Sequence, residues 1–140
     1  MRIPVALVIA LSAQVIGQFV KFFLYSARDG RISPHYLVSS GGVPSAHTAF
    51  VTALATYIGA TAGLTSDLFA VAAVFGSIVI YDAFRLRGHV QHHAAILNRL
   101  VLEPRGEEPT SEMIGHSLVE IAFGALLGGA VAGIGLLIVG

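Results

Sequence analysis

Four long apolar segments constrain the fold of this chain more than any other feature. They cover residues 3–24, 44–64, 68–81 and 114–139. All but the third reach the roughly 20 residues that a helix needs to cross a bilayer core. Only 11% of the chain is charged, against about 25% in soluble domains. Because a backbone in lipid must satisfy its own hydrogen bonds, each segment is expected to be helical. The sequence therefore predicts an integral membrane protein.

The predicted fold is all-α: one domain over residues 1–140, a helical bundle of about four transmembrane helices. Small residues recur on the second and fourth segments and permit close helix contact, within one chain or in a homodimer. Residues 89–102 have apolar side chains at helical spacing, which predicts an additional interfacial helix. Ser111 is the expected N-cap of the last helix. The link between the second and third segments, residues 65–67, is very short.

Polar residues gather in two connections, residues 25–43 and 82–113. With four crossings, both connections lie on the same side of the membrane. They hold or adjoin seven of the eight cationic side chains: Lys21, Arg28, Arg31, Arg85, Arg87, Arg99 and Arg105. The positive-inside rule places both connections in the cytoplasm. The formal net charge is zero, so no nucleic-acid partner is expected. The absence of cysteine excludes disulfides and thiolate chemistry.

The first chemical motif is Pro44-Ser45-Ala46-His47, which follows two glycines. Glycine before proline is typical of a helix start. The free N–H groups of a helix start bind anions, and the Ser45 hydroxyl adds a donor. His47, in the first turn, is a candidate proton donor. The alternative is structural: Ser45 caps the helix, and His47 lies at the level of the lipid headgroups.

The second motif is His116 with Glu120, which share a helical face at a separation of four residues. The carboxylate of Glu120 would keep one imidazole nitrogen protonated and leave the other as a nucleophile. The alternative is a buried hydrogen bond that fixes two helices together.

Three cations are candidate phosphate ligands. Lys21 and Arg28 are separated by six residues, and Arg87 follows Asp82, its candidate orienting partner. A guanidinium binds two phosphate oxygens at once. Alternatively, Lys21 extends to the interface and Arg87 sets topology. A histidine group is also present: His89, His92 and His93. Their neighbours and spacing favour a solvated helix face over a metal site, and no metal or other cofactor is predicted.

Taken together, these motifs resemble the type-2 phosphatidic acid phosphatase superfamily, which includes the vanadium haloperoxidases. Lys21 and Arg28 look like its first signature, residues 44–47 are similar to its Pro-Ser-Gly-His, and His116 with Glu120 resembles His-x-x-x-Asp. The most similar branch is the divergent one related to acid phosphatases and vanadium-dependent haloperoxidases, found in bacteria and plastids. Its Gly-Gly-Met-Pro-Ser-Ser-His-Ser, Asp-Ala-x-Gly-Val-Arg-Arg, Leu-Asn and Gly-His-x-Pro-x-Glu correspond to residues 41–48, 82–88, 97–98 and 115–120.

Several positions depart from these signatures. Asp29 replaces a proline, Ala46 replaces glycine or serine, and Glu120 replaces the aspartate of the wider superfamily. Arg85 stands where the branch has glycine, and Gly88 where it has a second arginine. Thr110 occupies the position of the superfamily's third-motif arginine. Arg87 is therefore the expected source of that charge.

The resemblance implies a metal-independent hydrolase that removes phosphate from a lipid phosphate or lipid diphosphate at the membrane interface. Membrane lipids are the implied partners, and a bacterial inner membrane or a plastid-type membrane is the implied location. His116 would form a phosphohistidine, Glu120 would stabilise its imidazolium, and His47 would act as acid and then base. The implied phosphate ligands, with Asp82 in a supporting role, are Lys21, Arg28, Ser45, the Ala46 amide and Arg87.

Other classes of function remain open at this stage. The alternative is a non-catalytic membrane protein that binds phospholipid headgroups, or a scaffold subunit, with the same cations as lipid-recognition patches; the presence of His47, His116 and Glu120 together speaks against it. A small transporter fits less well, because the polar residues lie at helix ends rather than in mid-membrane. A vanadate-dependent peroxidase is the least favoured reading.

Overall fold

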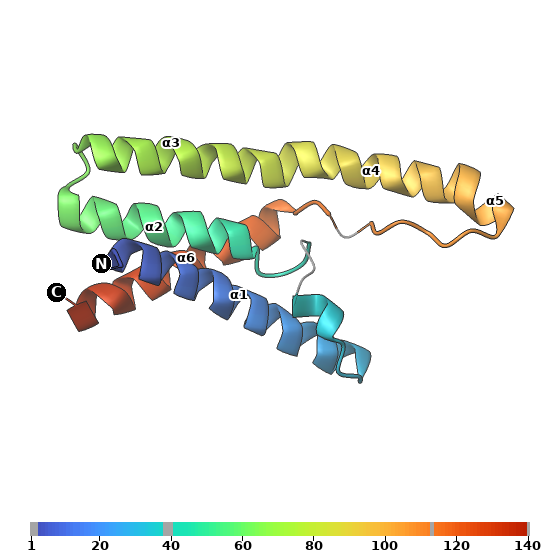
Figure 1. Ribbon diagram of the computed structural model, residues 1–140, viewed down its shortest axis with the longest axis horizontal. Coiled ribbons are helices and arrows are strands. Elements are labelled where there is room, and N and C mark those ends of the chain that lie inside the picture. Colours follow the sequence, from blue (N-terminus) through green and yellow to red (C-terminus); the bar gives the residue numbers. More distant parts are fainter. Residues whose placement is uncertain (1–2, 38–40, 113, 140) are drawn as a thin grey trace.

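The computed structural model describes residues 3–37, 41–112 and 114–139. Its main helices are α1 (Val5–Asp29), α2 (Ala46–Ala62), α3 (Asp67–Tyr81) and α6 (Leu118–Val139), and a short 3₁₀ helix (Pro34–Leu37) follows α1. The described residues contain no β-strand. The fold is therefore the predicted all-α helical bundle (Figure 1).

The third apolar segment continues far beyond the point where its hydropathy ends. From α3 the chain passes through a π-helical turn (Asp82–Leu86) into α4 (Arg87–Leu97), a second π-helical turn (Asn98–Leu102) and α5 (Glu103–Arg105). These pieces form one rod that extends beyond the other helices (Figure 1). The predicted connection at residues 82–113 is thus largely helical. The helix predicted at residues 89–102 is present, but it continues α3 and is not a separate interfacial element.

Among the described residues, three helical stretches are long and apolar enough to cross a membrane: α1, the rod from Asp67 to Arg105, and α6. The fourth, α2, has 17 residues, or roughly 25 Å of length. It is the central helix and packs against α1, α3 and α6. Because α2 is covered by its neighbours, it has less need to match the bilayer thickness than the outer helices.

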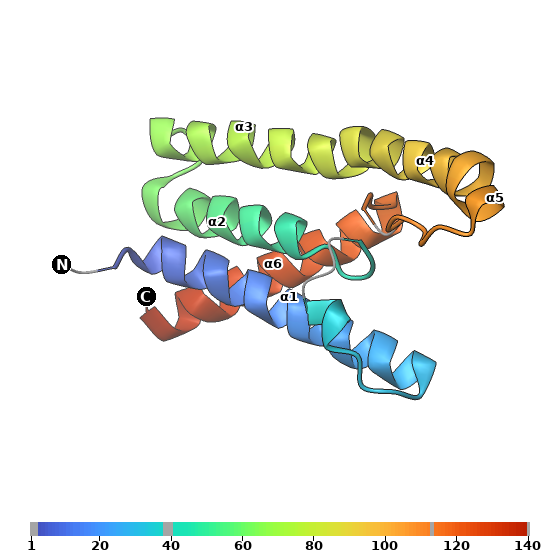
Figure 2. The same ribbon diagram turned by 45° about the vertical axis from the view of Figure 1, so that its right-hand side comes forward.

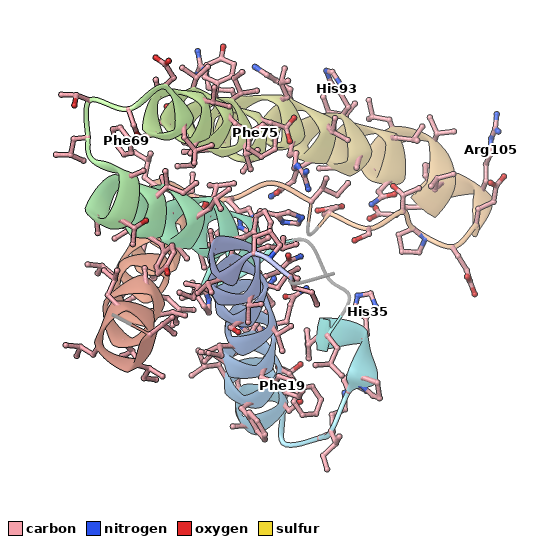
Figure 3. All side chains as sticks on the ribbon, turned by 60° about the vertical axis from the view of Figure 1, so that its left-hand side comes forward. Phe19, His35, Phe69, Phe75, His93 and Arg105 are labelled. Atoms are coloured by element: carbon pink, nitrogen blue, oxygen red, sulfur yellow. The ribbon has the colours of Figure 1, made fainter. Side chains whose placement is uncertain are left out.

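Small side chains allow these helices to approach closely. Ala49 and Ala53 of α2 are fully buried. A Cβ added to Gly124 or Gly128 of α6 would collide with the backbone oxygen of Ser45 or Ala49. Glycine is therefore required at these two contacts with α2, as close helix packing in a membrane favours. Large apolar side chains lie on the outer surface instead, where lipid solvates them; Phe19 and Phe75 are examples (Figure 3).

The helix ends that carry the two motifs lie at the same end of the bundle. The C-terminal end of α1, the start of α2, the start of α6 and the beginning of α4 gather there, while both chain termini lie at the opposite end (Figures 1 and 2). The bundle therefore brings sequence segments about 70 residues apart into one polar region.

Candidate active site

His116 and Glu120 form the best-defined pair in this polar region. His116 is 5% exposed, and its Nδ1 lies 2.8 Å from Glu120 Oε2. An ionised carboxylate can only accept a hydrogen bond, so Nδ1 carries the proton. Nε2 is then the nitrogen with a lone pair, and it is buried without a hydrogen-bond partner among the described residues. The arrangement fixes the tautomer of His116 and leaves the Nε2 lone pair without a protein partner among the described residues.

Backbone contacts with the long rod fix the loop that carries His116. Its amide donates to the carbonyl of Ala83 in the first π-helical turn, with an N···O distance of 3.1 Å. The Gly115 amide donates to Gln91 Oε1 at 3.1 Å. A Cβ on Gly115 would lie 2.9 Å from the Gly88 backbone, so only glycine allows this approach. The rod thus acts as a support for the loop.

Asn98 secures the same loop further along the rod. It is 3% exposed, and its Nδ2 donates to Thr110 O and to Glu112 Oε1, both at 2.8 Å. Its Oδ1 accepts from Thr110 N at 2.8 Å and from Thr110 Oγ1 at 2.9 Å. The Asn98 side chain makes four hydrogen bonds, and these satisfy its amide group and explain why this polar side chain can be buried. Thr110, at the position of the superfamily's arginine, is therefore used in this clamp.

Glu120 has a second role as part of the cap of α6. The Glu120 amide donates to Ser117 Oγ at 3.3 Å, and Glu120 Oε2 accepts from the Ser117 amide at 3.4 Å. This reciprocal pattern is a capping box. The prediction that Ser111 caps the last helix is wrong, because α6 begins at Leu118. The Ser-x-x-Glu spacing was the signal that would have identified the true start.

The start of α2 connects the two motifs directly. Ser45 is fully buried, and its amide donates to the Glu120 carbonyl at 3.1 Å. Its Oγ accepts from Thr48 Oγ1 at 2.9 Å and from Thr48 N at 3.4 Å. Ser45 is therefore the N-cap of α2, as the structural alternative expected. Its hydroxyl proton remains a donor, and helix geometry leaves the Ala46 and His47 amides without an acceptor in α2.

Tyr25 positions the chain just before α2 and was missed by the sequence reasoning. Its hydroxyl accepts from the Val43 amide at 3.2 Å. Gly42 has φ = 94°, and a Cβ there would lie 2.8 Å from the Tyr25 hydroxyl. The glycine is thus required for both conformation and space. The spacing from Lys21 to Tyr25, one turn of α1 on the same face, was the available signal.

Lys21 lies inside the bundle. It is 1% exposed, which contradicts the reading that it extends to the interface. Glu120 is close enough to act on it electrostatically. His47 is half-buried and is similarly influenced by Arg87, His116 and Lys21. The fold therefore gathers two cations, two histidines and a carboxylate at the start of α2.

Arg87 approaches this group from the rod. Its Nε donates to Asp82 Oδ2 at 2.6 Å, and both side chains are about one-third exposed. Asp82 begins the π-helical turn and Arg87 follows it. Within the described residues, the bond to Asp82 uses Nε of Arg87. Asp82 therefore orients the guanidinium, and the two terminal amino groups stay available to bind an anion. π-Helical turns frequently mark functional sites.

Arg28 is the predicted ligand that the structure does not bring to the others. Its side chain is 72% exposed and its Nε lies 3.3 Å from Asp29 Oδ1. Its guanidinium carbon lies 5.0 Å from the centre of the Tyr25 ring. Asp29 also accepts a short hydrogen bond from the Tyr36 hydroxyl. Asp29, which replaces the proline of the signature, thus holds Arg28 at the surface.

Burial lowers the pKa of His116 below its usual value of 6.5. Glu120 opposes this shift through its hydrogen bond and charge, whereas Lys21 and Arg87 add to it. The imidazole is therefore neutral at pH 7, which a nucleophilic nitrogen requires.

The histidine group on α4 lies apart from this centre. His89, His92 and His93 are exposed, and His93 projects away from the bundle (Figure 3). In the described ranges, no three histidine, aspartate or glutamate side chains converge as metal ligands. These histidines belong to the solvated face of the rod.

Comparison with known proteins places the chain among its relatives. It matches the model of the "Divergent PAP2 family" over residues 4–131. It is 32% identical over 135 residues to the "Uncharacterized membrane protein YuiD" of Bacillus subtilis (strain 168), with 85% of each chain covered. No solved structure matches it. Both matches confirm the resemblance that the motifs indicated, and the protein belongs to the divergent PAP2 family.

Proposed function

We propose that this protein is a metal-independent phosphohydrolase that acts on a lipid phosphate or lipid diphosphate at the membrane interface. The observation that carries the proposal is the state of His116. Its Nδ1 is held by Glu120, while its Nε2 is buried, without a partner in the described part of the chain, and close to cations. A buried nitrogen that no protein group in the described residues engages keeps its lone pair for a substrate, which supports a reactive role.

In the first step, the lone pair of His116 Nε2 forms a bond to phosphorus and the bond from phosphorus to the leaving oxygen breaks. His47, protonated once the anionic substrate lies beside it, donates a proton to that oxygen, and the dephosphorylated lipid leaves. Glu120 stabilises the positive charge on the phosphorylated imidazole. Lys21, Arg87 and the N–H groups at the start of α2 stabilise the charge on the phosphoryl oxygens, which is the main requirement of phosphoryl transfer.

In the second step, water attacks the phosphohistidine. His47, now neutral, accepts a proton from the water, and the nitrogen–phosphorus bond breaks to release inorganic phosphate and regenerate His116. The nucleophile and the charge stabilisation come from side chains and amides, so the proposed route needs no metal. The site lies at one end of a membrane bundle, where a lipid headgroup can reach it while its chains stay in the bilayer.

The test is phosphate release by purified protein in detergent with EDTA, from phosphatidic acid, phosphatidylglycerol phosphate and polyprenyl diphosphate. His116→Ala should reduce release at least 10³-fold, while His93→Ala, on the solvated face, should keep the wild-type rate. Brief incubation with ³²P-labelled substrate should label the wild type but not His116→Ala, with the acid lability of a phosphohistidine. Full turnover by folded His116→Ala would remove the nucleophile from the proposal.

One observation favours a second candidate, a non-catalytic protein that binds phospholipid headgroups or acts as a scaffold. Ser45 and Glu120 both make helix-capping bonds, so neither residue requires a catalytic explanation. This function predicts headgroup binding that His116→Ala leaves unchanged, with no phosphate released from any substrate in the panel.

A further inference from the structure

An apolar groove of about 540 Å³ lies between α1 and α6, next to the candidate active site. This volume is within the usual range of ligand sites. Its lining includes Leu24 of α1, Val43 and Pro44 before α2, and Phe123, Leu126 and Ala130 of α6. The groove, called here the α1–α6 groove, is not needed for any chemical step.

The α1–α6 groove begins beside the charged residues of the site. Leu24 lies one turn after Lys21 on α1, and Phe123 lies one turn after Glu120 on α6. Pro44 immediately precedes Ser45. From Phe123 to Ala130 the groove follows α6 for roughly 10 Å, away from the site and toward the middle of the helix. The groove is thus lined by apolar side chains alone, and Lys21 and Glu120 lie one turn from one of its ends.

The crossing of α1 and α6 explains why the groove opens at this end. The helices meet where Ile9 packs on Gly135 and where Leu127 approaches Gly17. Beyond this crossing they diverge toward the ends that carry Arg28 and Glu120 (Figures 1 and 2). A smaller hollow beside Arg28 shares Leu24 and Val43 with the groove, so a further cation lies at its mouth.

We propose that the α1–α6 groove holds one hydrocarbon chain of the anionic lipid whose phosphate lies between Lys21, Arg87 and His116. The proposal rests on the proposed location of the phosphate site. Its basis is charge complementarity: the apolar groove adjoins an Arg28-lined hollow, with which it shares Leu24 and Val43, as the apolar chain of an anionic amphiphile adjoins its charged head. A second apolar groove of about 600 Å³, between α2 and α3, extends toward Gly59 and Leu64 at the opposite end of α2.

Photolabelling in vesicles tests the position of the chain directly. The probe is phosphatidic acid with a diazirine in the first half of one acyl chain, within the length of the groove, in phosphatidylcholine vesicles. We expect at least fivefold more label on residues 123–130 than on the lipid-facing surface of α3 at Val71, Val74 and Ile78. Excess unlabelled phosphatidic acid should remove the difference, and diacylglycerol should not. Equal labelling of both surfaces, or the same pattern from diazirine-labelled diacylglycerol, would overturn the proposal.

Labelling also separates this proposal from the phosphatase proposal. Phosphate-dependent labelling of the groove by a protein that releases no phosphate would support the groove and remove the hydrolase function. Because the chain contains no cysteine, Leu126→Cys introduces a single thiol. Its oxidation to a disulfide-linked dimer in vesicles would show that a second copy occupies the groove, and would contradict a lipid chain there.

A matched pair of substitutions tests the consequence for specificity. Ala130→Phe fills the groove, whereas Ala122→Phe adds the same ring to another exposed alanine of α6 outside it. The measured quantity is the ratio of kcat/KM for a long-chain phosphatidic acid to kcat/KM for a water-soluble phosphate monoester. This ratio should fall at least tenfold in Ala130→Phe and stay within twofold in Ala122→Phe. An equal fall in both variants would place the chain elsewhere.

Discussion

Lys21 and Arg28 lie about two turns apart on α1 and occupy opposite environments. Lys21 is 1% exposed and lies in the field of Glu120. Arg28 is at the surface, beside Asp29 and the Tyr25 ring. In the sequence the two cations form one signature; in the fold one belongs to the interior of the bundle and the other to its rim. The difference is made by the residues around them, not by their spacing.

The two environments should give the two charges unequal effects. A charge in a poorly solvated interior interacts several times more strongly with a phosphoryl group than a charge in water does. Exposed charges are screened by salt and lose side-chain entropy when they pair. We therefore expect the rate of the chemical step to depend on Lys21, inside the bundle. Arg28, at the rim, should affect only the binding of the substrate.

Lys21→Met should reduce kcat/KM for a lipid phosphate by about 10² to 10³, the usual cost of one charge-stabilising donor. Methionine keeps the length of the lysine stem, so packing in the bundle should be retained. Phosphate release in detergent gives the effect, and thermal unfolding shows whether the bundle is intact. A loss below threefold in a folded variant would mean that burial of Lys21 has no catalytic purpose.

Glu120→Gln should reduce kcat by about 10- to 100-fold. Glutamine still accepts from His116 Nδ1 and still completes a capping box, so the change removes charge while preserving geometry. Ser117→Ala is the matched control, because it removes the cap and leaves the carboxylate. It should lower the free energy of unfolding by about 1 kcal/mol with little change in kcat. Equal losses of activity in both variants would indicate that Glu120 matters only as a cap.

The pH dependence of kcat/KM should reflect the lowered pKa of the buried His116. Its nitrogen must be neutral to attack phosphorus, and burial lowers its pKa, so kcat/KM should fall on the acidic side with a midpoint below pH 6.5. Glu120 raises this pKa, so Glu120→Gln should shift the midpoint to lower pH. The unfolded chain binds the proton more readily, so the free energy of unfolding should fall as pH drops from 6.5 through the folded pKa. A midpoint above 6.5 that depends on His116 would contradict the assigned environment.

The sequence was sufficient for the helices and for the order of the motifs, because both depend on local signals. Hydropathy located α1, α2, α3 and α6 to within a few residues at most ends. It failed at Asp82, where polarity begins but the helix continues: falling hydropathy marks the end of the lipid-facing surface, whereas a helix ends where its hydrogen bonds end. The first proline beyond Asp82 is Pro104, so nothing in between forces the rod to stop.

The candidate site could be predicted only in part, because some of its contacts depend on tertiary structure. The spacing of four residues predicted that His116 and Glu120 meet, but the predicted shared helical face is wrong: His116 precedes α6, which begins at Leu118, so the hydrogen bond joins the loop to the first turn of the helix. The support of the loop by Gln91 and Asn98 joins residues 12 to 24 positions apart, and no periodicity connects them. The position of Arg28 depends on Asp29 and on Tyr36, which returns to α1 through the 3₁₀ helix. Motif matching gave Arg28 the same role as Lys21 because it could not include these neighbours.

Arg28→Met should have the smallest effect, a change in kcat/KM within about threefold at physiological ionic strength, because an exposed charge is screened. The residual effect should appear in KM rather than kcat and should disappear in high salt, as expected of a cation that attracts an anionic headgroup without contacting the transferred phosphoryl group. Asp29→Asn sharpens the comparison. It removes the carboxylate charge that holds Arg28, so if Arg28 then moves inward, kcat/KM should rise in Asp29→Asn alone and return to the Arg28→Met value in the double variant. A loss from Arg28→Met as large as that from Lys21→Met would show that the rim and the interior act as one site during turnover, and that Asp29 releases Arg28 when substrate binds.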